Sequence, residues 1–166
     1  VRGLVLASGY YFPTARWDFW MLSGPAMPVL GDIMRFTVAP IISWAILPAI
    51  YRKLFAPREV PENFRHGFPS SLTLRPKQLR AAAEESAFLI PEAARLQSRY
   101  PSIRCPVHIF HGTEDQIIEP EQASRLQEVL DRSALHLVRG AGHMVTYADS
   151  TAMAQAVESL EVAMAR

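Results

Sequence analysis

One short stretch of the chain decides the fold: CPVHIFHGTED, at residues 105–115. Its apolar run gives way at once to polar residues, which is typical of a buried strand that ends in a loop. A second stretch of this kind, GAGHM at residues 140–144, follows the apolar run 134–138. An acid, Asp115, therefore stands after one predicted strand, and a histidine, His143, stands after the next.

The segments around these stretches predict a parallel α/β sheet, because strands alternate with helices across short loops. The predicted strands are 1–8, 106–110 and 134–138. The first is rich in Val and Leu, and we expect it to be buried on both faces. Helical patterns cover 120–130 and 151–165. The last of these helices, capped by Asp149 or Ser150, is expected to bury Met153, Ala156, Val157, Leu160 and Met164.

The segment between the first strand and the rest of the sheet has a different texture, with most of the 13 prolines of the chain. We expect short helices broken by prolines, as in a cap or lid inserted between two strands. The predicted helices are 14–22, 32–39, 41–54 and 76–89, with Pro76 at a first helical position. The predicted domains are a core strand at 1–10, a helical cap at 11–100 and a C-terminal α/β core at 101–166.

The middle segment is rich in aromatic residues and methionines. Most of them are expected to form the core of the cap, and a few to line an apolar pocket. These residues are Trp17, Phe19, Trp20, Met21, Met27, Met34, Phe36 and Trp44. The candidates for substrate contact are Trp17, Trp20, Met21 and Met144, the last because it directly follows His143.

Composition excludes several classes of partner. The net charge of +1 is mixed along the chain, which does not favour nucleic acid. Cys105 is the single cysteine, so no intrachain disulfide can form, and no signal-peptide pattern opens the chain. We expect a cytoplasmic location. Residues 36–50 carry no charge but are shorter than the roughly 20 residues of a membrane span, and Pro40 and Pro48 interrupt them; membrane contact is the less favoured alternative.

Asp115 and His143 are candidates for acid–base chemistry. In an open parallel sheet the carboxyl ends of the strands meet at one edge, so the two side chains can converge there. A carboxylate holds an imidazole in the required tautomer, and the imidazole then moves the proton of a nucleophile. Gly112 permits a tight departure from the strand, and Gly140 and Gly142 allow a sharp turn before His143. No Gly-x-Ser-x-Gly motif occurs anywhere in the chain.

At these residues, 105–115 and 140–144, the chain resembles the α/β-hydrolase family. The opening run 1–8 is similar to the family strand that follows the nucleophile elbow and its helix, and the middle segment takes the position of the variable cap. The resemblance implies that Asp115 is the acid and His143 the general base of a triad. It also implies that this is the C-terminal portion of a longer protein, with the nucleophile and the oxyanion-hole amides upstream.

Each assignment has a plain alternative. Asp115 could cap the following helix, and the adjacent Glu114 could be the acid instead, although the offset from the strand favours Asp115. His143 could be an ordinary loop histidine. His111 is expected to position the Asp115 loop rather than to react. A metal site is not expected, because His108 and His111, three apart in a strand, point to opposite faces. Ser8 lacks the context of a nucleophile elbow.

The sequence thus favours a carboxylesterase-like hydrolase for a small apolar ester, with no cofactor. Its partners are expected to be the small-molecule substrate and the upstream half of the same fold. This chain alone is expected to be inactive. Two alternatives stay open: an Asp-nucleophile enzyme of the dehalogenase or epoxide-hydrolase type, in which His143 activates water, and a non-catalytic binding module that keeps the hydrolase shape.

Overall fold

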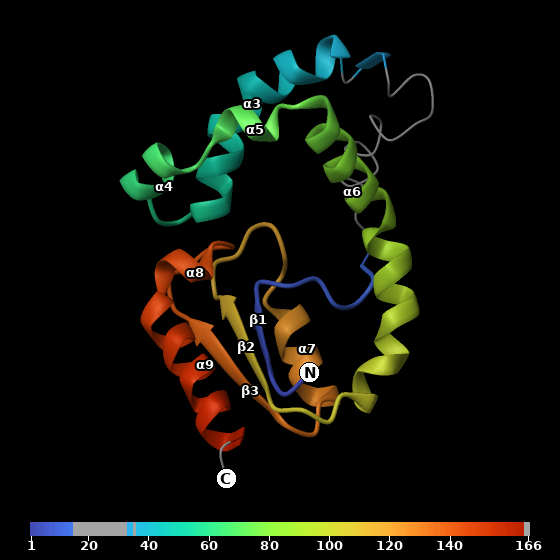
Figure 1. Ribbon diagram of the computed structural model, residues 1–166, viewed down its shortest axis with the longest axis vertical. Helices are drawn as coiled ribbons and strands as arrows, with labels where there is room; N and C mark the ends of the chain where they lie inside the picture. Colours follow the sequence, from blue (N-terminus) through green and yellow to red (C-terminus); the bar gives the residue numbers. More distant parts are fainter. Residues whose placement is uncertain (15–32, 35, 165–166) are drawn as a thin grey trace. The chain divides into compact units, whose positions relative to one another are not determined.

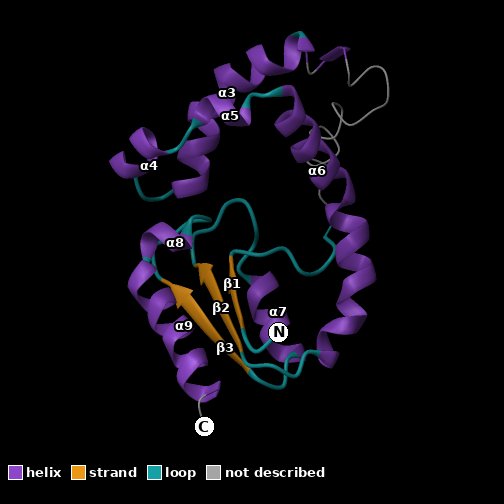
Figure 2. Cartoon of the chain, viewed as in Figure 1, coloured by secondary structure: helices purple, strands orange, loops and turns teal. Residues whose placement is uncertain are grey.

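The computed structural model describes residues 1–14, 33, 34 and 36–164 of the 166 residues, and the described parts form two compact units (Figure 1). Unit 1 comprises Val1–Tyr11, Arg52–Glu59 and Leu96–Arg166, and unit 2 comprises Phe12–Tyr51 and Val60–Arg95. Strands occur in unit 1, whereas the described part of unit 2 is helical (Figure 2). The domain boundaries expected from the sequence stay a prediction.

Unit 1 is built on a parallel three-stranded sheet in the order β1-β2-β3. The strands are β1 (Leu4–Ala7), β2 (Val107–Gly112) and β3 (Ser133–Val138), close to the predicted runs. In register, Leu4 pairs with Val107, and Val107 pairs with Ser133. The expectation that the first strand is buried on both faces is wrong for this chain. Leu4, Val5 and Leu6 are half-buried and Ala7 is exposed, and among the described strands β1 stands at the edge of the sheet.

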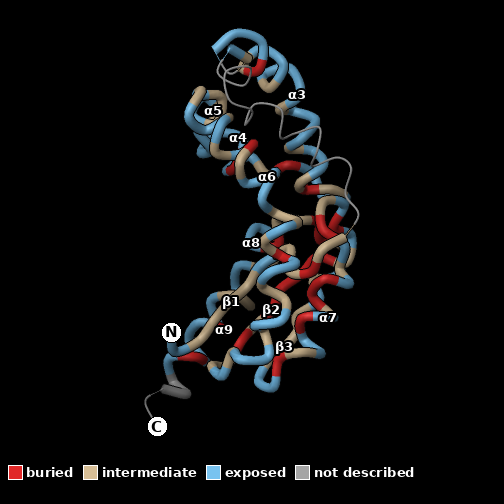
Figure 3. Tube along the Cα trace, turned by 90° about the vertical axis from the view of Figure 1, so that its right-hand side faces the viewer, coloured by how far each residue is buried: buried red, intermediate tan, exposed pale blue. Residues whose placement is uncertain are grey.

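Helices cover both faces of the sheet, with α7 (Glu121–Val129) on one side and α9 (Ser150–Met164) on the other (Figures 1 and 3). A short helix that the sequence did not reveal, α8 (Val145–Ala148), precedes α9. The side chain of Asp149 caps α9 through the amide of Ala152, as predicted. Phe110 packs with Val145 and Ala156 in the core on the α9 side.

The predicted apolar face of α9 is right in part. Ala156 and Leu160 are buried and Met153 is half-buried, but Val157 is 47% exposed because it lies on the outer side of the helix. The side chain of Met164 lies outside the described residues. The buried positions that remain keep a spacing of three and four residues, so this helix meets the sheet along a narrow stripe.

The described part of unit 2 contains two long helices beside two short ones, so the expectation of short helices broken by prolines is right only in part. Its elements are α3 (Val38–Phe55, whose last residues belong to unit 1), α4 (Glu62–Gly67), α5 (Ser70–Thr73) and α6 (Pro76–Leu96). Pro40 falls in the first turn of α3, where a backbone N–H has no helical partner to lose. Pro48 and Pro91 lie inside their helices without ending them. α6 begins at Pro76, as predicted. The predicted helix 14–22 lies mostly outside the described residues.

α3 also changes one premise of the membrane argument. The helix is continuous over 18 residues, so the prolines do not interrupt its apolar run. Among the described helices it is the one long and apolar enough to cross a membrane, by length and composition alone. Most of its residues are exposed, including Ile41 and Trp44, and it is drawn largely in pale blue in Figure 3.

Candidate active site

Two loops at the carboxyl edge of the sheet form the candidate site. One follows β2 and carries Asp115; the other follows β3 and carries His143. Backbone bonds join the loops directly: the amide of Thr113 donates to Val138, at 3.1 Å, and the amide of Glu114 donates to Ala141, at 3.0 Å. The Thr113 hydroxyl also accepts the amide of Gly140, at 3.1 Å. These bonds fix the distance between the acid and the histidine before any substrate binds.

Glycines are needed where the two loops touch. A Cβ added at Gly112 would lie 2.2 Å from the carbonyl oxygen of Gly142, and one at Gly142 would lie 2.1 Å from that of Ala56. Real Cβ atoms essentially never come so near to backbone atoms. Gly140 turns with φ of +61°, in the left-handed region. The glycines singled out in the sequence therefore allow close approach and a tight turn.

Asp115 contacts His143 directly, with 2.9 Å between the carboxylate Oδ2 and the imidazole Nδ1. The acid side chain is fully buried, whereas His143 is 23% exposed. The other carboxylate oxygen, Oδ1, accepts the amides of Ile117 at 2.8 Å and Ile118 at 3.0 Å. Asp115 thus also caps the turn that follows it, so the structural alternative and the proposed chemical role coexist in one side chain.

The electrostatics keep Asp115 ionised. Burial by itself would raise the pKa of the Asp115 carboxyl, but hydrogen bonds from His111, His143 and the Ile118 amide, with the attraction of His143, outweigh it. The pKa of Asp115 therefore lies well below its ordinary value. A carboxylate that stays charged, bonded to Nδ1, leaves Nε2 of His143 as the nitrogen that can exchange protons with a reacting group.

Arg58 supports the histidine loop, and nothing in the sequence pattern pointed to it. Its guanidinium donates to the carbonyls of Gly140 at 2.8 Å, Arg139 at 3.2 Å and Ala148 at 3.2 Å. The backbone carbonyl of Leu54, four residues before Arg58, accepts a hydrogen bond from the amide of Met144, at 3.2 Å. Residues 52–59, distant in sequence, thus belong to unit 1 because they brace the loop that carries His143.

The structure distinguishes the remaining candidate residues from Asp115 and His143. Glu114 is exposed, and it is Asp115 that bonds His143. His108 bonds His136, Nδ1 to Nε2 at 2.9 Å, whereas His111 is buried beside Asp115, so the two histidines do not converge. Ser8 has φ of +47° and a buried hydroxyl that hydrogen-bonds no described residue, His143 included. Within the described residues no group of three or more His, Cys, Asp or Glu could hold a metal ion.

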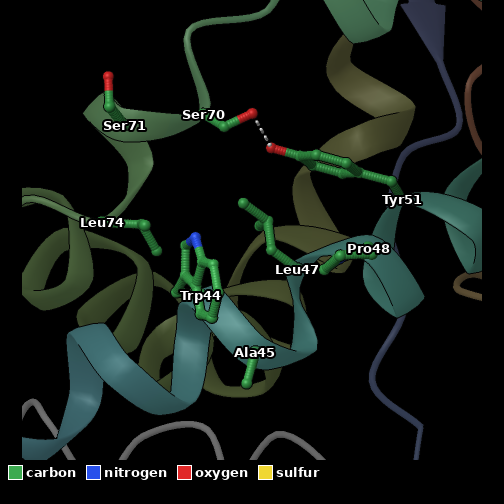
Figure 4. A pocket seen from close by; sticks show the side chains of 8 residues that line it. All are labelled: Trp44, Ala45, Leu47, Pro48, Tyr51, Ser70, Ser71 and Leu74. Atoms are coloured by element: carbon green, nitrogen blue, oxygen red, sulfur yellow. Dashed lines mark hydrogen bonds between the residues drawn. The ribbon is translucent and has the colours of Figure 1, made fainter.

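Unit 2 contains an apolar groove of its own, of about 450 Å³. It lies between α3 and α5, and the hydroxyl of Tyr51 donates to that of Ser70 at 3.0 Å along its border. Trp44, Leu47 and Leu74 point toward one another below this hydrogen bond, while Ser71 points away (Figure 4). Of the expected substrate contacts, Trp17, Trp20 and Met21 lie outside the described residues, and Met144 is half-buried beside His143.

Comparison with solved structures identifies the fold. An α/β-hydrolase fold protein from Burkholderia ambifaria matches with a TM-score of 0.69 and 20% identity, over 94% of this chain and 56% of its own. An esterase from Exiguobacterium antarcticum matches with a TM-score of 0.68 and 18% identity, over 97% and 57%. The fold is that of the α/β-hydrolases. No protein-family model and no curated protein matches the sequence.

A haloalkane dehalogenase variant from Bradyrhizobium elkanii shares the same hydrolase fold, with a TM-score of 0.66 and 17% identity, over 100% of this chain and 62% of its own. The chain therefore spans little more than half the length of the hydrolases it matches. Identities this low show the fold alone, because one fold hosts many chemistries.

Proposed function

We propose that this chain supplies the acid and the general base of an α/β-hydrolase active site, Asp115 and His143, and is the C-terminal portion of a carboxylesterase-like hydrolase. The observation that carries the proposal is the 2.9 Å contact between a fully buried, ionised carboxylate and the Nδ1 of a partly exposed histidine. The contact lies at the carboxyl edge of a parallel sheet, where ligands of such folds bind.

The chemistry follows from the geometry of this pair. Asp115 holds the Nδ1 proton of His143 and stabilises the imidazolium that forms when Nε2 takes a proton from the attacking hydroxyl. The same Nε2 returns that proton to the leaving group, and the cycle repeats with water. Asp115 stays ionised throughout. We assign the nucleophile to sequence upstream of Val1, because the chain contains no Gly-x-Ser-x-Gly motif and the hydroxyl of Ser8 has no hydrogen bond to His143 among the described residues.

The substrate class is proposed from the composition of the segment 11–100, which is rich in aromatic residues and methionines. Side chains of this kind favour an ester with an apolar acyl or alcohol portion over a charged or sugar-like one. We expect the specificity constant of the full-length protein to rise as the acyl chain of a test ester lengthens from two to several carbons. A preference for charged acyl groups would contradict this assignment.

The test of the reaction class is active-site labelling of the full-length protein with a serine-reactive fluorophosphonate. We expect one stoichiometric label on a serine upstream of Val1, and none on Ser8. Esterase activity should disappear in parallel with labelling. A label within this chain would show that the nucleophile is misassigned.

An Asp nucleophile is the second candidate, favoured by the haloalkane dehalogenase variant among the structures that share the fold. In that mechanism the upstream carboxylate displaces a halide from the substrate, and His143 activates the water that cleaves the resulting ester. Halide release from haloalkanes, without fluorophosphonate labelling, would decide for it. Absence of both activities, with ligand binding retained, would favour the non-catalytic module.

A further inference from the structure

A second histidine, His111, contacts the same carboxylate oxygen of Asp115 as His143, and the proposed mechanism does not use it. It is the penultimate residue of β2, with no exposed surface. Its Nε2 lies 3.0 Å from the carbonyl oxygen of Ile118 and 3.2 Å from Oδ2 of Asp115. A histidine costs free energy to bury unless its polar atoms are used, so these contacts call for a physical account.

The two contacts determine which nitrogen carries the proton. Both partners of Nε2 are acceptors, a carbonyl oxygen and a carboxylate oxygen, so Nε2 must be the donor and its proton is shared between them. Nδ1 is buried and has no hydrogen-bond partner among the described residues. A doubly protonated ring would bury an unsatisfied N–H at Nδ1, whereas the neutral ring leaves only an unused lone pair. The geometry therefore favours the neutral ring with its proton on Nε2.

This tautomer joins three parts of the site. The Ile118 peptide accepts from His111 through its oxygen and donates to Asp115 Oδ1 through its nitrogen, at 3.0 Å. Oδ2 of Asp115 receives a proton donor from each histidine, His111 at 3.2 Å and His143 at 2.9 Å. His111, on strand β2, thus contacts both the turn through Ile118 and the carboxylate of Asp115. Donors on both oxygens fix the plane of that carboxylate.

We propose that His111 is a positioning residue: as a neutral Nε2–H donor it orients the Asp115 carboxylate and shares the oxygen that holds His143. The inference rests on the proposed function, since the role concerns the acid of the same pair. The donation also favours the charged form of the carboxyl, and the pKa of Asp115 is lowered in part by this bond.

The test is a pH titration of the Asp115 carboxyl in the full-length protein. It is monitored by NMR on a sample labelled with ¹³C at aspartate carboxyls. His111→Leu keeps an apolar side chain in the space but removes the donor, and should raise the pKa of Asp115 by about one unit, the effect of losing one hydrogen bond to a charged group. His111→Gln can place its amide nitrogen near the former Nε2 and should restore most of the wild-type titration. His108→Leu, on the same strand but bonded to His136, is the matched control and should leave it unchanged.

A second readout is the NMR resonance of the His143 Nδ1 proton. It should move downfield in His111→Leu, because Oδ2 of Asp115 then accepts from one donor instead of two. Unchanged Asp115 titration in a folded His111→Leu protein would overturn the proposal, as would equal shifts in the Leu and Gln variants. If the Leu variant does not fold, failure of His111→Gln to keep the wild-type titration would overturn it. These readouts need no turnover, so failure of the positioning role is distinguishable from failure of the hydrolase assignment.

Discussion

Replacing Asp115 by Asn should damage stability and activity together, for separate reasons. The amide oxygen of Asn can still accept the backbone amides of Ile117 and Ile118 at the position of Oδ1. The amide nitrogen then stands at the position of Oδ2, where it faces the donors of His143 and His111, at 2.9 and 3.2 Å. The contact with His111 becomes donor–donor in a fully buried place, because its Nε2–H also bonds the Ile118 carbonyl, whereas His143 can move its proton to Nε2. Losing a hydrogen bond to a buried charged group costs about 1.5–3 kcal/mol.

A loss of that size is a large fraction of the roughly 5–15 kcal/mol that stabilises a typical domain. We expect denaturant unfolding of the full-length protein to report it at pH 7. The difference from wild type should shrink in acid, because a carboxyl with a lowered pKa contributes stability above its ordinary range near pH 4 and loses it as the pH falls. Glu114→Gln removes the adjacent exposed carboxylate and is the matched control.

The loss of activity follows from the tautomer. An amide nitrogen beside Nδ1 favours the form of His143 that carries its proton on Nε2, which cannot accept the proton of a nucleophile. Substitution of this kind in a serine protease lowers kcat by about 10⁴, and we expect a comparable fall in ester hydrolysis. An Asp115→Asn protein with wild-type stability, or with kcat reduced less than tenfold, would refute this reasoning.

Two further substitutions test how the loops are held. Gly112→Ala forces a Cβ against the backbone of Ala141 and Gly142 and should lower the melting temperature by several degrees. The control Gly67→Ala has open space around the new Cβ and should be neutral or slightly stabilising. Equal melting temperatures of the two variants in calorimetry would contradict the close approach at Gly112. Arg58→Ala removes three hydrogen bonds to the carbonyls of the histidine loop and its flank, and should lower kcat more than it raises KM. The free energy of unfolding should fall by only about 1 kcal/mol, because Arg58 is exposed. Arg58→Lys should not restore it, since an ammonium cannot span three carbonyls; full rescue by lysine would count against the bracing role.

The sheet could be predicted because its information is local. Each strand is an apolar run that ends in a polar loop, and the period of the helices that follow shows their buried side. The partial exposure of β1 could not be read in this way, because the burial of a strand depends on the elements packed against it rather than on its own sequence. The prolines misled in part. A proline removes one hydrogen bond from a helix, but it need not end the helix, as Pro48 and Pro91 show.

The site could be predicted only in outline. An acid and a histidine that follow successive predicted strands indicated Asp115 and His143 as candidates. The structure places the two side chains in contact, and their catalytic role stays a prediction. Arg58 could not be found from the pattern, since its partners are backbone carbonyls that any sequence offers. His111 was expected to position the loop, but its contact with the carboxylate needed the three-dimensional course of the turn through Ile118.

The most direct test of the account is the kcat/KM of His143→Ala in the full-length protein, measured with a short acyl ester beside the wild-type enzyme. Without a general base the nucleophile cannot lose its proton, and kcat/KM should fall by at least about 10³ while the protein stays folded. A folded His143→Ala protein that hydrolyses the ester at the wild-type rate would contradict the assignment of Asp115 and His143 as the acid and base of the reaction.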